Sequence, residues 1–152
     1  MYAIHEGLRI VLEEGLENRF ARHRRNYKAL RAGLEALGMR YVAPTAHQLP
    51  QLHAVYLPPG VTEELPVRKR LLDAYGIEIG GGLGELKGKI WRIGLMGYSC
   101  KPENVMLCLS ALGSVLADMG MPVHVGEAEA AAHGAYAALH AKAAQAKKKK
   151  AA

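Results

Sequence analysis

The feature that most constrains this chain is the apolar stripe along its first 37 residues. Hydrophobic side chains recur there at spacings of three, four and seven, as on one face of an α-helix. Gly38 follows the last of them, as a helix-ending glycine does. A single helix over 2–37 would be ~54 Å long at about 1.5 Å per residue. Because that length exceeds the diameter of a small domain, the helix is expected to bridge two bodies or to meet a partner chain.

The remaining pattern predicts a small α+β (α/β) domain. Apolar segments bounded by proline or glycine predict strands at 39–43, 52–57, 77–79 and 90–95. Apolar periodicity predicts helices at 62–76 and 102–119. This order favours a small, mostly antiparallel sheet with helices on one face.

These elements predict a division of the chain into three parts. Residues 1–38 are the long interdomain helix and residues 39–122 are the small domain. Residues 123–152 form an Ala/Lys-rich tail, expected to be a weak helix or disordered.

Cysteine and histidine usage gives no metal or nucleophile pattern. Cys100 and Cys108 would be ~12 Å apart on a helix, which is too far for a disulfide. A reduced, intracellular protein, cytoplasmic in location, is therefore expected. The pair His5-Glu6 lacks the second histidine of a zinc helix motif. We therefore expect no metal site. No apolar run is long enough for a membrane span, so we expect no membrane partner either.

The net charge of +6 is unevenly distributed. Residues 127–152 hold five lysines and two glutamates, four of the lysines at 147–150, whereas the rest of the chain is nearly balanced. Such a tail binds phosphate without specificity. A solvated, frayed terminus explains it as well, and no specific nucleic-acid partner is expected.

A glycine-rich segment, 80–88, lies between two predicted strands. It fits no phosphate-loop spacing, because Leu83 stands where the first glycine is needed and Ile90 follows Lys89 in place of Ser or Thr. The segment is either a flexible connection or a loop whose bare backbone allows a ligand to approach closely.

Arg92 is the sharpest single candidate. Alternation along 90–95 puts Trp91 and Ile93 on the core face and Arg92 on the opposite face, beside Gly94. A planar guanidinium there can bind a carboxylate through two parallel hydrogen bonds. The alternative is a surface arginine on the open face of a sheet.

Three stretches of the chain carry a family resemblance. The first comprises YAIHEGL at 2–8, LENR at 16–19 and LEALG at 34–38; the second is GIEIGGGLG at 76–84; the third is GKIWRIGLMG at 88–97, followed by ENV at 103–105. Together, over about residues 2–120, the chain resembles the class V, fold-type I pyridoxal-phosphate aminotransferases. It is most similar to the serine–glyoxylate, serine–pyruvate and alanine–glyoxylate kind.

The resemblance implies a role for particular residues. Arg92 matches the arginine that holds the substrate's α-carboxylate, and Gly81 and Gly82 match the loop beside it. Residues 2–37 match the helix that links the large cofactor domain to the C-terminal small domain. Members of the family act as homodimers on amino acids and 2-oxo acids.

The cofactor, pyridoxal 5′-phosphate, is held in the family by a large domain that contains the Schiff-base lysine. No lysine here matches that lysine, so no catalytic or cofactor-binding residue is expected in this chain. We expect a truncated reading frame that is inactive alone, because transamination needs the cofactor ring.

Two rival functions stay open at this point. The first is a non-catalytic domain that binds a partner or phosphate through the long helix and the lysine tail. The second is another class V reaction, such as cysteine desulfuration or phosphoserine transamination. A desulfurase should carry a reactive cysteine in a mobile loop, and the resemblance gives Cys100 no such role.

Overall fold

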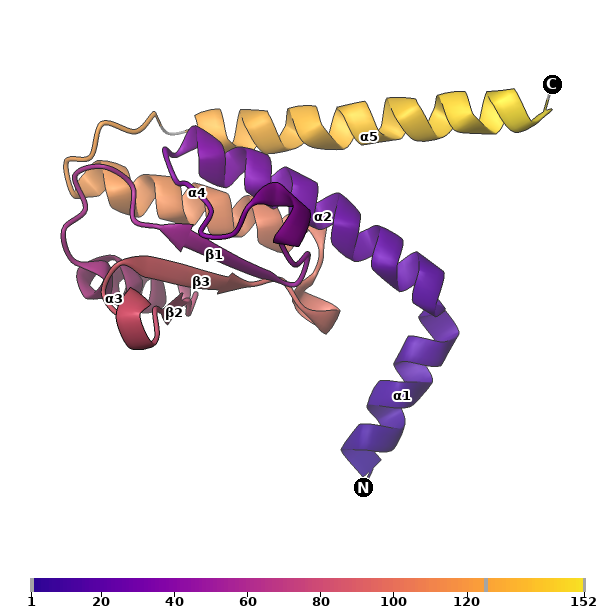
Figure 1. Cartoon of the computed structure of the whole chain (residues 1–152), viewed down its shortest axis with the longest axis horizontal. Helices are drawn as coiled ribbons and strands as arrows, with labels where there is room; N and C mark the ends of the chain where they lie inside the picture. Colours follow the sequence, from indigo (N-terminus) through magenta and orange to yellow (C-terminus); the bar gives the residue numbers. More distant parts are fainter. Residues whose placement is uncertain (1, 125, 152) are drawn as a thin grey trace.

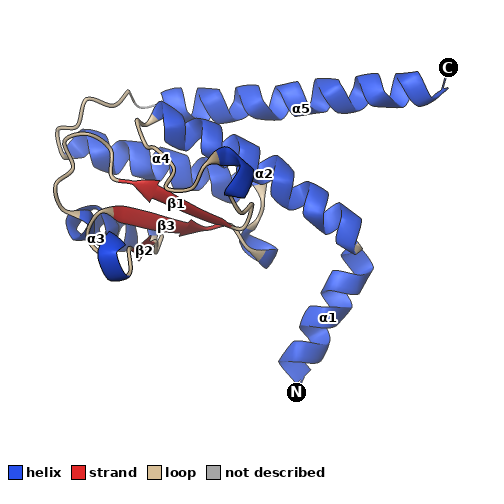
Figure 2. Ribbon diagram, in the orientation of Figure 1, coloured by secondary structure: helices blue, strands red, loops and turns tan. Residues whose placement is uncertain are grey.

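The protein, described from a computed structural model, is a three-stranded antiparallel sheet covered on one face by helices (Figures 1 and 2). The structure describes residues 2–124 and 126–151. The helices are α1 (Tyr2–Glu14), α2 (Leu16–Ala36), α3 (Glu64–Tyr75), α4 (Pro102–Asp118) and α5 (Glu127–Ala151). The strands are β1 (Leu52–Tyr56), β2 (Gly80–Gly81) and β3 (Ile90–Gly94). The expected α+β class, with a small antiparallel sheet, is confirmed.

Strand β3 is the middle of the sheet, whose order is β1-β3-β2. It pairs antiparallel with β1 from Leu52↔Gly94 to Tyr56↔Ile90, and with β2 at Gly80↔Arg92. Trp91 therefore lies opposite Val55 of β1 and Gly81 of β2. The backbone of the middle strand is therefore hydrogen-bonded on both sides.

The core fills the space between one face of β3 and helices α2, α3 and α4. Trp91 is fully buried there, and its indole N–H donates to the Glu64 carbonyl at 3.2 Å. The expectation that Trp91, Ile93 and Leu95 face the core is confirmed. Each large aliphatic side chain buried in this layer contributes ~1.5–3 kcal/mol. The main helical contributors are Leu30, Leu34, Leu71, Leu109, Leu112 and Leu116.

The expected single helix over residues 2–37 is wrong in one respect, because it is broken at Gly15. Gly15 has φ 77° and ψ 139°, which only glycine adopts readily, and α1 leaves the body at an angle to α2 (Figure 1). The carboxylate of Glu14 then reaches Arg22 across the bend. None of the described residues of α1 is buried.

Two of the four expected strands differ from the sequence pattern. Segment 39–43 forms only an isolated bridge, Tyr41↔Val55. Segment 77–79 is not a strand, and β2 begins at Gly80 instead. The cause lies at the end of α3, where Gly76 is left-handed and the Ile77 N–H donates to the Leu71 carbonyl at 3.2 Å. The backbone at Ile77 therefore closes the helix and is not available to the sheet.

The alanine-rich segment forms helix α5, which packs along α2 (Figure 1). Ala128 and Ala132 are buried, and the Tyr136 hydroxyl donates to Asn26 Oδ1 at 2.8 Å. The weak or disordered tail expected from composition is thus a docked helix over its first turns. The side chains of Lys147–Lys150 lie outside the described residues, so the phosphate-binding interpretation stays a prediction. Across the described residues, no helix has the length and apolar character needed to cross a membrane.

Because Gly33 has no side chain, α2 packs closely against Leu109 of α4 and against the backbone of Ala128 in α5. A β-carbon there would lie 2.3 and 2.6 Å from the two Leu109 methyl carbons and 3.0 Å from the Ala128 carbonyl oxygen. Leu109 is fully buried, so its side chain could yield only by repacking within the core. We expect Gly33→Ala to lower the free energy of unfolding by ~1–3 kcal/mol through overpacking, measured by urea denaturation.

Gly134 of α5 provides the matched control, since nothing lies within 4 Å of its added β-carbon. Gly134→Ala should leave stability unchanged or raise it by up to ~1 kcal/mol, as alanine favours a helix over glycine. Equal effects of the two substitutions would contradict the packing described here.

Candidate functional site

Arg92 lies on the open face of the sheet, in the middle of β3 and beside the glycine bend of β2. Its Nε–H donates to the Gly81 carbonyl at 2.7 Å. A β-carbon at the neighbouring Gly80 would come within 3.3 Å of Nη2 and 3.5 Å of Cζ of Arg92. The guanidinium therefore lies along bare backbone, held by one edge. Its side chain is half-buried, and it forms no salt bridge with any described residue.

The glycines of the bend are explained by close contacts within the chain. A β-carbon at Gly82 would lie 1.9 Å from the Leu86 carbonyl oxygen and 2.9 Å from the Ile90 side chain. At Gly81 it would lie 2.7 Å from Glu64 Oε1. Neither glycine has a positive φ, so space and not backbone conformation requires them. The loop thereby covers Ile90, which is buried although it shares the face of Arg92.

Three of the sequence candidates are thus brought together. Gly81 accepts the hydrogen bond from Arg92, whereas Gly82 lies where the loop folds over Ile90. A role of these residues toward a substrate remains a prediction. The sequence pattern missed Arg68 of α3, which donates to the Ile79 carbonyl at 2.7 Å from beneath the same bend.

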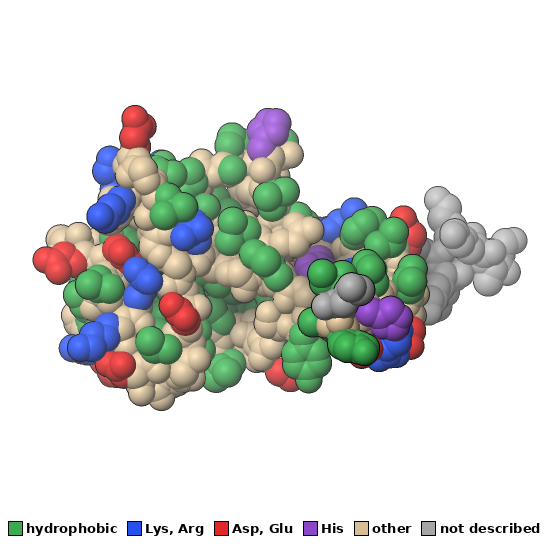
Figure 3. Space-filling view, turned by 90° about the horizontal axis from the view of Figure 1, so that it is seen from below, with side chains coloured by type: hydrophobic (Ala, Val, Ile, Leu, Met, Phe, Trp, Pro, Cys, Tyr) green, Lys and Arg blue, Asp and Glu red, His purple; other side chains and the backbone are tan. Residues whose placement is uncertain are grey.

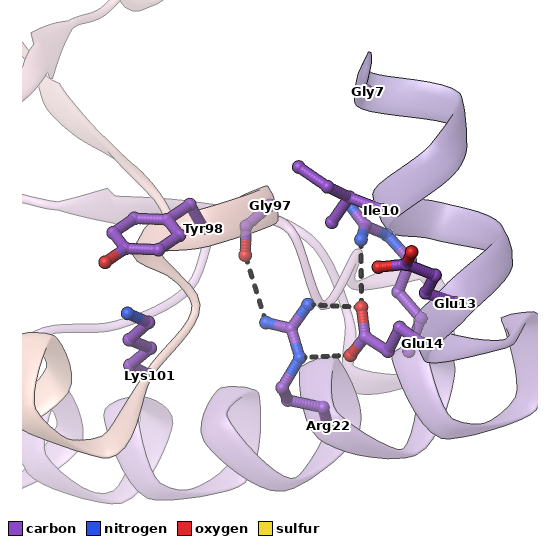
Figure 4. A pocket seen from close by; sticks show the side chains of 9 residues that line it. Gly7, Ile10, Glu13, Glu14, Arg22, Gly97, Tyr98 and Lys101 are labelled. Atoms are coloured by element: carbon purple, nitrogen blue, oxygen red, sulfur yellow. Dashed lines mark hydrogen bonds and ion pairs between the residues drawn. The ribbon is translucent and has the colours of Figure 1, made fainter. Parts of the chain in front are cut away.

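An open cavity of about 590 Å³ lies between α1 and the turn that follows β3 (Figure 4). The Glu14 carboxylate accepts hydrogen bonds from both Arg19 and Arg22, chiefly Arg22, which lowers the pKa of Glu14 to about 2. Arg22 also donates to the carbonyls of Gly97 at 3.0 Å and Cys100 at 2.7 Å. The cluster joins the helix bend to the turn after β3. Its two arginines are already neutralised in part by Glu14, and Arg92 does not line this cavity.

A second polar cluster lies on the core side of β1. His53 is fully buried, and its Nδ1 contacts the Tyr41 hydroxyl. Burial raises the pKa of Tyr41, so the hydroxyl stays protonated. Among the described residues, His53 Nε2 has no hydrogen-bond partner. Burial lowers the pKa of His53 to about 4, so the ring is neutral near pH 7.

Neither cysteine has the surroundings of a reactive thiol. Cys100 is buried and its Sγ is 3.4 Å from Asn26 Nδ2. Desolvation raises the pKa of the half-buried Cys108 thiol to about 11. The Cys100 thiol is therefore inaccessible and the Cys108 thiol stays protonated, unlike a nucleophilic thiolate. Within the described part of the chain, no group of three or more His, Cys, Asp or Glu side chains could hold a metal ion.

Several known proteins are similar to this chain in sequence and in fold. The (S)-ureidoglycine–glyoxylate transaminase of Bacillus subtilis is 46% identical over 136 residues, which cover 90% of this chain and 32% of that protein. The alanine–glyoxylate aminotransferase of Callithrix jacchus is 41% identical over 117 residues, covering 76% and 28%. No family model matches the chain.

Solved structures agree with the sequence relatives. The crystal structure of ureidoglycine–glyoxylate aminotransferase from Bacillus subtilis superposes with a TM-score of 0.84 over 89% of this chain and 35% of that one, at 46% identity. That of pyridoxamine–pyruvate aminotransferase from Mesorhizobium loti gives 0.80 over 86% and 33%, at 35% identity.

The chain belongs to the class V aminotransferases of the serine/alanine–glyoxylate kind. It spans about a third of the length of these relatives. The resemblance read from the sequence motifs is therefore confirmed.

Protonation of His53 should weaken the fold in mild acid. The folded-state pKa of about 4 lies below the ordinary value of 6.5. The unfolded chain thus binds the proton more readily, and stability is lost as pH falls from 6.5 to 4. The loss should reach ~3 kcal/mol, at about 1.4 kcal/mol per pKa unit. Urea unfolding of the chain at pH 7 and pH 4.5 measures it.

The variant His53→Phe keeps a ring in the same space and removes the titration. Its stability should fall less between pH 7 and pH 4.5 than that of the parent chain. An identical pH dependence in both proteins would show that His53 is not the group responsible.

Proposed function

We propose that this chain is the carboxylate-binding part of a pyridoxal-phosphate-dependent aminotransferase. The whole protein would transfer an amino group from serine or alanine to glyoxylate or another 2-oxo acid. The observation that carries the proposal is the Arg92 guanidinium, fixed at Nε by the Gly81 carbonyl and without an anionic partner among the described residues. Such a group is arranged to accept a carboxylate on its remaining N–H donors.

One arginine suits both halves of this reaction. Serine, alanine and glyoxylate all carry a carboxylate next to the carbon that reacts. A bidentate contact at that carboxylate orients the reacting carbon in the same way for donor and acceptor. The names of the relatives support this choice of acceptor. Two of them combine different amino donors with glyoxylate, and a third names pyruvate, which is also a 2-oxo acid.

No described lysine of this chain has the surroundings expected of a Schiff-base lysine. A Schiff-base lysine needs an enclosed site, which lowers its pKa. Four of the lysines whose side chains are described are exposed, and the fifth, Lys101, is half-exposed and lies 3.4 Å from the centre of the Tyr98 ring. The lysine would be supplied by the rest of the protein, so the 152-residue chain by itself should show no transamination.

The surface of α1 supports a role as a connection to the remainder of the enzyme. Hydrophobic side chains gather there in the view from below (Figure 3). Ile4, Leu8 and Leu12 are 70%, 59% and 79% exposed, and at this spacing they form an apolar helix face that the rest of the described chain does not cover. We therefore propose that residues 1–38 link the large domain to the small one, 39–122, in a cytoplasmic homodimer.

The rival class V reaction has less support. Cysteine desulfuration needs an accessible thiolate, whereas Cys100 is buried and burial raises the pKa of Cys108. No observation on the described residues favours the desulfurase over the aminotransferase.

Substitution of Arg92 tests the proposal in the intact, cofactor-loaded protein that carries this chain. Arg92→Lys keeps the charge but loses the bidentate geometry. KM for the amino donor and for glyoxylate should each rise ~10-fold or more, which corresponds to about 1.4 kcal/mol. Steady-state kinetics with both substrates measures the change.

Arg24→Lys, an exposed position on α2, is the control and should leave both KM values unchanged. Unchanged KM values in Arg92→Lys would refute the assignment of Arg92.

A further inference from the structure

A second arginine holds the glycine bend from the side opposite Arg92. Arg68, on α3, donates from Nε to the Ile79 carbonyl at 2.7 Å. Its Nη1 donates to both carboxylate oxygens of Glu64, at 3.2 and 3.0 Å. The side chains of Arg68 and Glu64 are only 25% and 16% exposed. The pair is therefore a fixed, largely desolvated contact and not a mobile surface ion pair.

The ion pair is packed directly against the backbone that holds Arg92. A β-carbon at Gly81 would lie 2.7 Å from Glu64 Oε1 and 3.0 Å from Arg68 Nη1. The Gly81 carbonyl is the acceptor for Arg92 Nε at 2.7 Å. Two guanidinium groups thus bind the carbonyls of alternate residues: Ile79, which precedes β2, and Gly81, its last residue.

Strand β2 needs such support because little else holds it. Its pairing with β3 covers only Gly80↔Arg92 and Gly81↔Trp91. The segment before it is diverted, since the Ile77 N–H closes α3. From the α3 side, Arg68 binds the backbone at Ile79, directly before this short strand.

Charge also suits the arrangement. Glu64 neutralises Arg68 at contact distance, so the second cation beneath the bend does not repel Arg92. A lysine at position 68 has one ammonium group and cannot present the two differently directed donors that reach Ile79 and Glu64 together.

We propose that Arg68 is a positioning residue for Arg92. Arg68 is held by Glu64 and fixes the Ile79–Gly81 backbone. The Gly81 carbonyl in turn fixes Arg92 Nε, so that the outer edge of the Arg92 guanidinium is directed at a substrate carboxylate. The inference rests on the proposed function, in which Arg92 binds the α-carboxylate. Because a guanidinium binds a carboxylate in one defined geometry, a contact that touches no substrate but moves Arg92 weakens binding of the carboxylate.

The test has two readouts on Arg68→Met. In the 152-residue chain, nitrogen-edited NMR follows hydrogen exchange at Arg92 Nε–H, which should accelerate about 10-fold or more when the bend is released. In the intact, cofactor-loaded protein, KM for glyoxylate should rise ~5–20-fold while kcat changes less than about 3-fold, because uniform binding is what weakens.

Arg68→Lys and Arg70→Met complete the design. Arg68→Lys keeps the helix charge and donates from a single nitrogen, so it should restore part of the exchange protection and part of the KM. Arg70 is exposed on the same helix, and Arg70→Met should change neither readout.

The outcomes separate this inference from the proposed function. Unchanged Arg92 Nε–H exchange in Arg68→Met, even with a lower melting temperature, means that Arg68 only stabilises the fold and overturns the inference. Faster exchange with an unchanged KM overturns it as well, provided that Arg92→Lys raises KM. If Arg92→Lys leaves KM unchanged, the proposed function fails, and the exchange rates alone then decide whether Arg68 positions Arg92.

Discussion

The hydrogen bond from Arg92 Nε to the Gly81 carbonyl, at 2.7 Å, is the interaction on which the site depends. It ties the middle strand of the sheet to an edge strand of only two residues. An arginine side chain has several rotatable bonds, and ordering it costs up to ~2 kcal/mol of entropy. Because this bond forms in the folded protein without a ligand, the side chain is already ordered before a ligand binds. The guanidinium is thus preorganised, which favours binding of a planar anion.

Several other features serve to keep this bond in place. Gly80 leaves room for the guanidinium, and Gly82 lets the loop fold back onto Ile90. On the opposite face, Trp91 is fully buried and its indole N–H reaches the start of α3. Alternation along one strand therefore links the most buried side chain of the core to the proposed ligand-binding side chain.

Local pattern was sufficient for much of the fold and for the placement of Arg92. The period of two along 90–95 separates Trp91 from Arg92 without any knowledge of neighbours, and Pro102 marks the start of α4. The break at Gly15 was not predictable, because glycine is tolerated inside helices and the apolar stripe continues past it. What stabilises the bend is a contact between Glu14 and Arg22, eight residues apart.

The crowding at the glycines was also out of reach from sequence. The atoms that exclude a side chain at Gly81 belong to Glu64 and Arg68, which approach only after α3 has packed. The same holds for the Ile79 carbonyl, where Arg68 takes the place of a sheet partner. Contacts between segments that are distant in sequence determine which residues fit at these positions. The residues next to them in the sequence give no indication of those contacts.

The most direct test of the account is a crystal structure of the intact, cofactor-loaded protein with a bound 2-oxo acid. The account predicts both carboxylate oxygens at ~2.7–2.9 Å from nitrogens on the outer edge of the Arg92 guanidinium, with Nε still bonded to the Gly81 carbonyl. A carboxylate held by other groups, with Arg92 beyond hydrogen-bond reach, would contradict it.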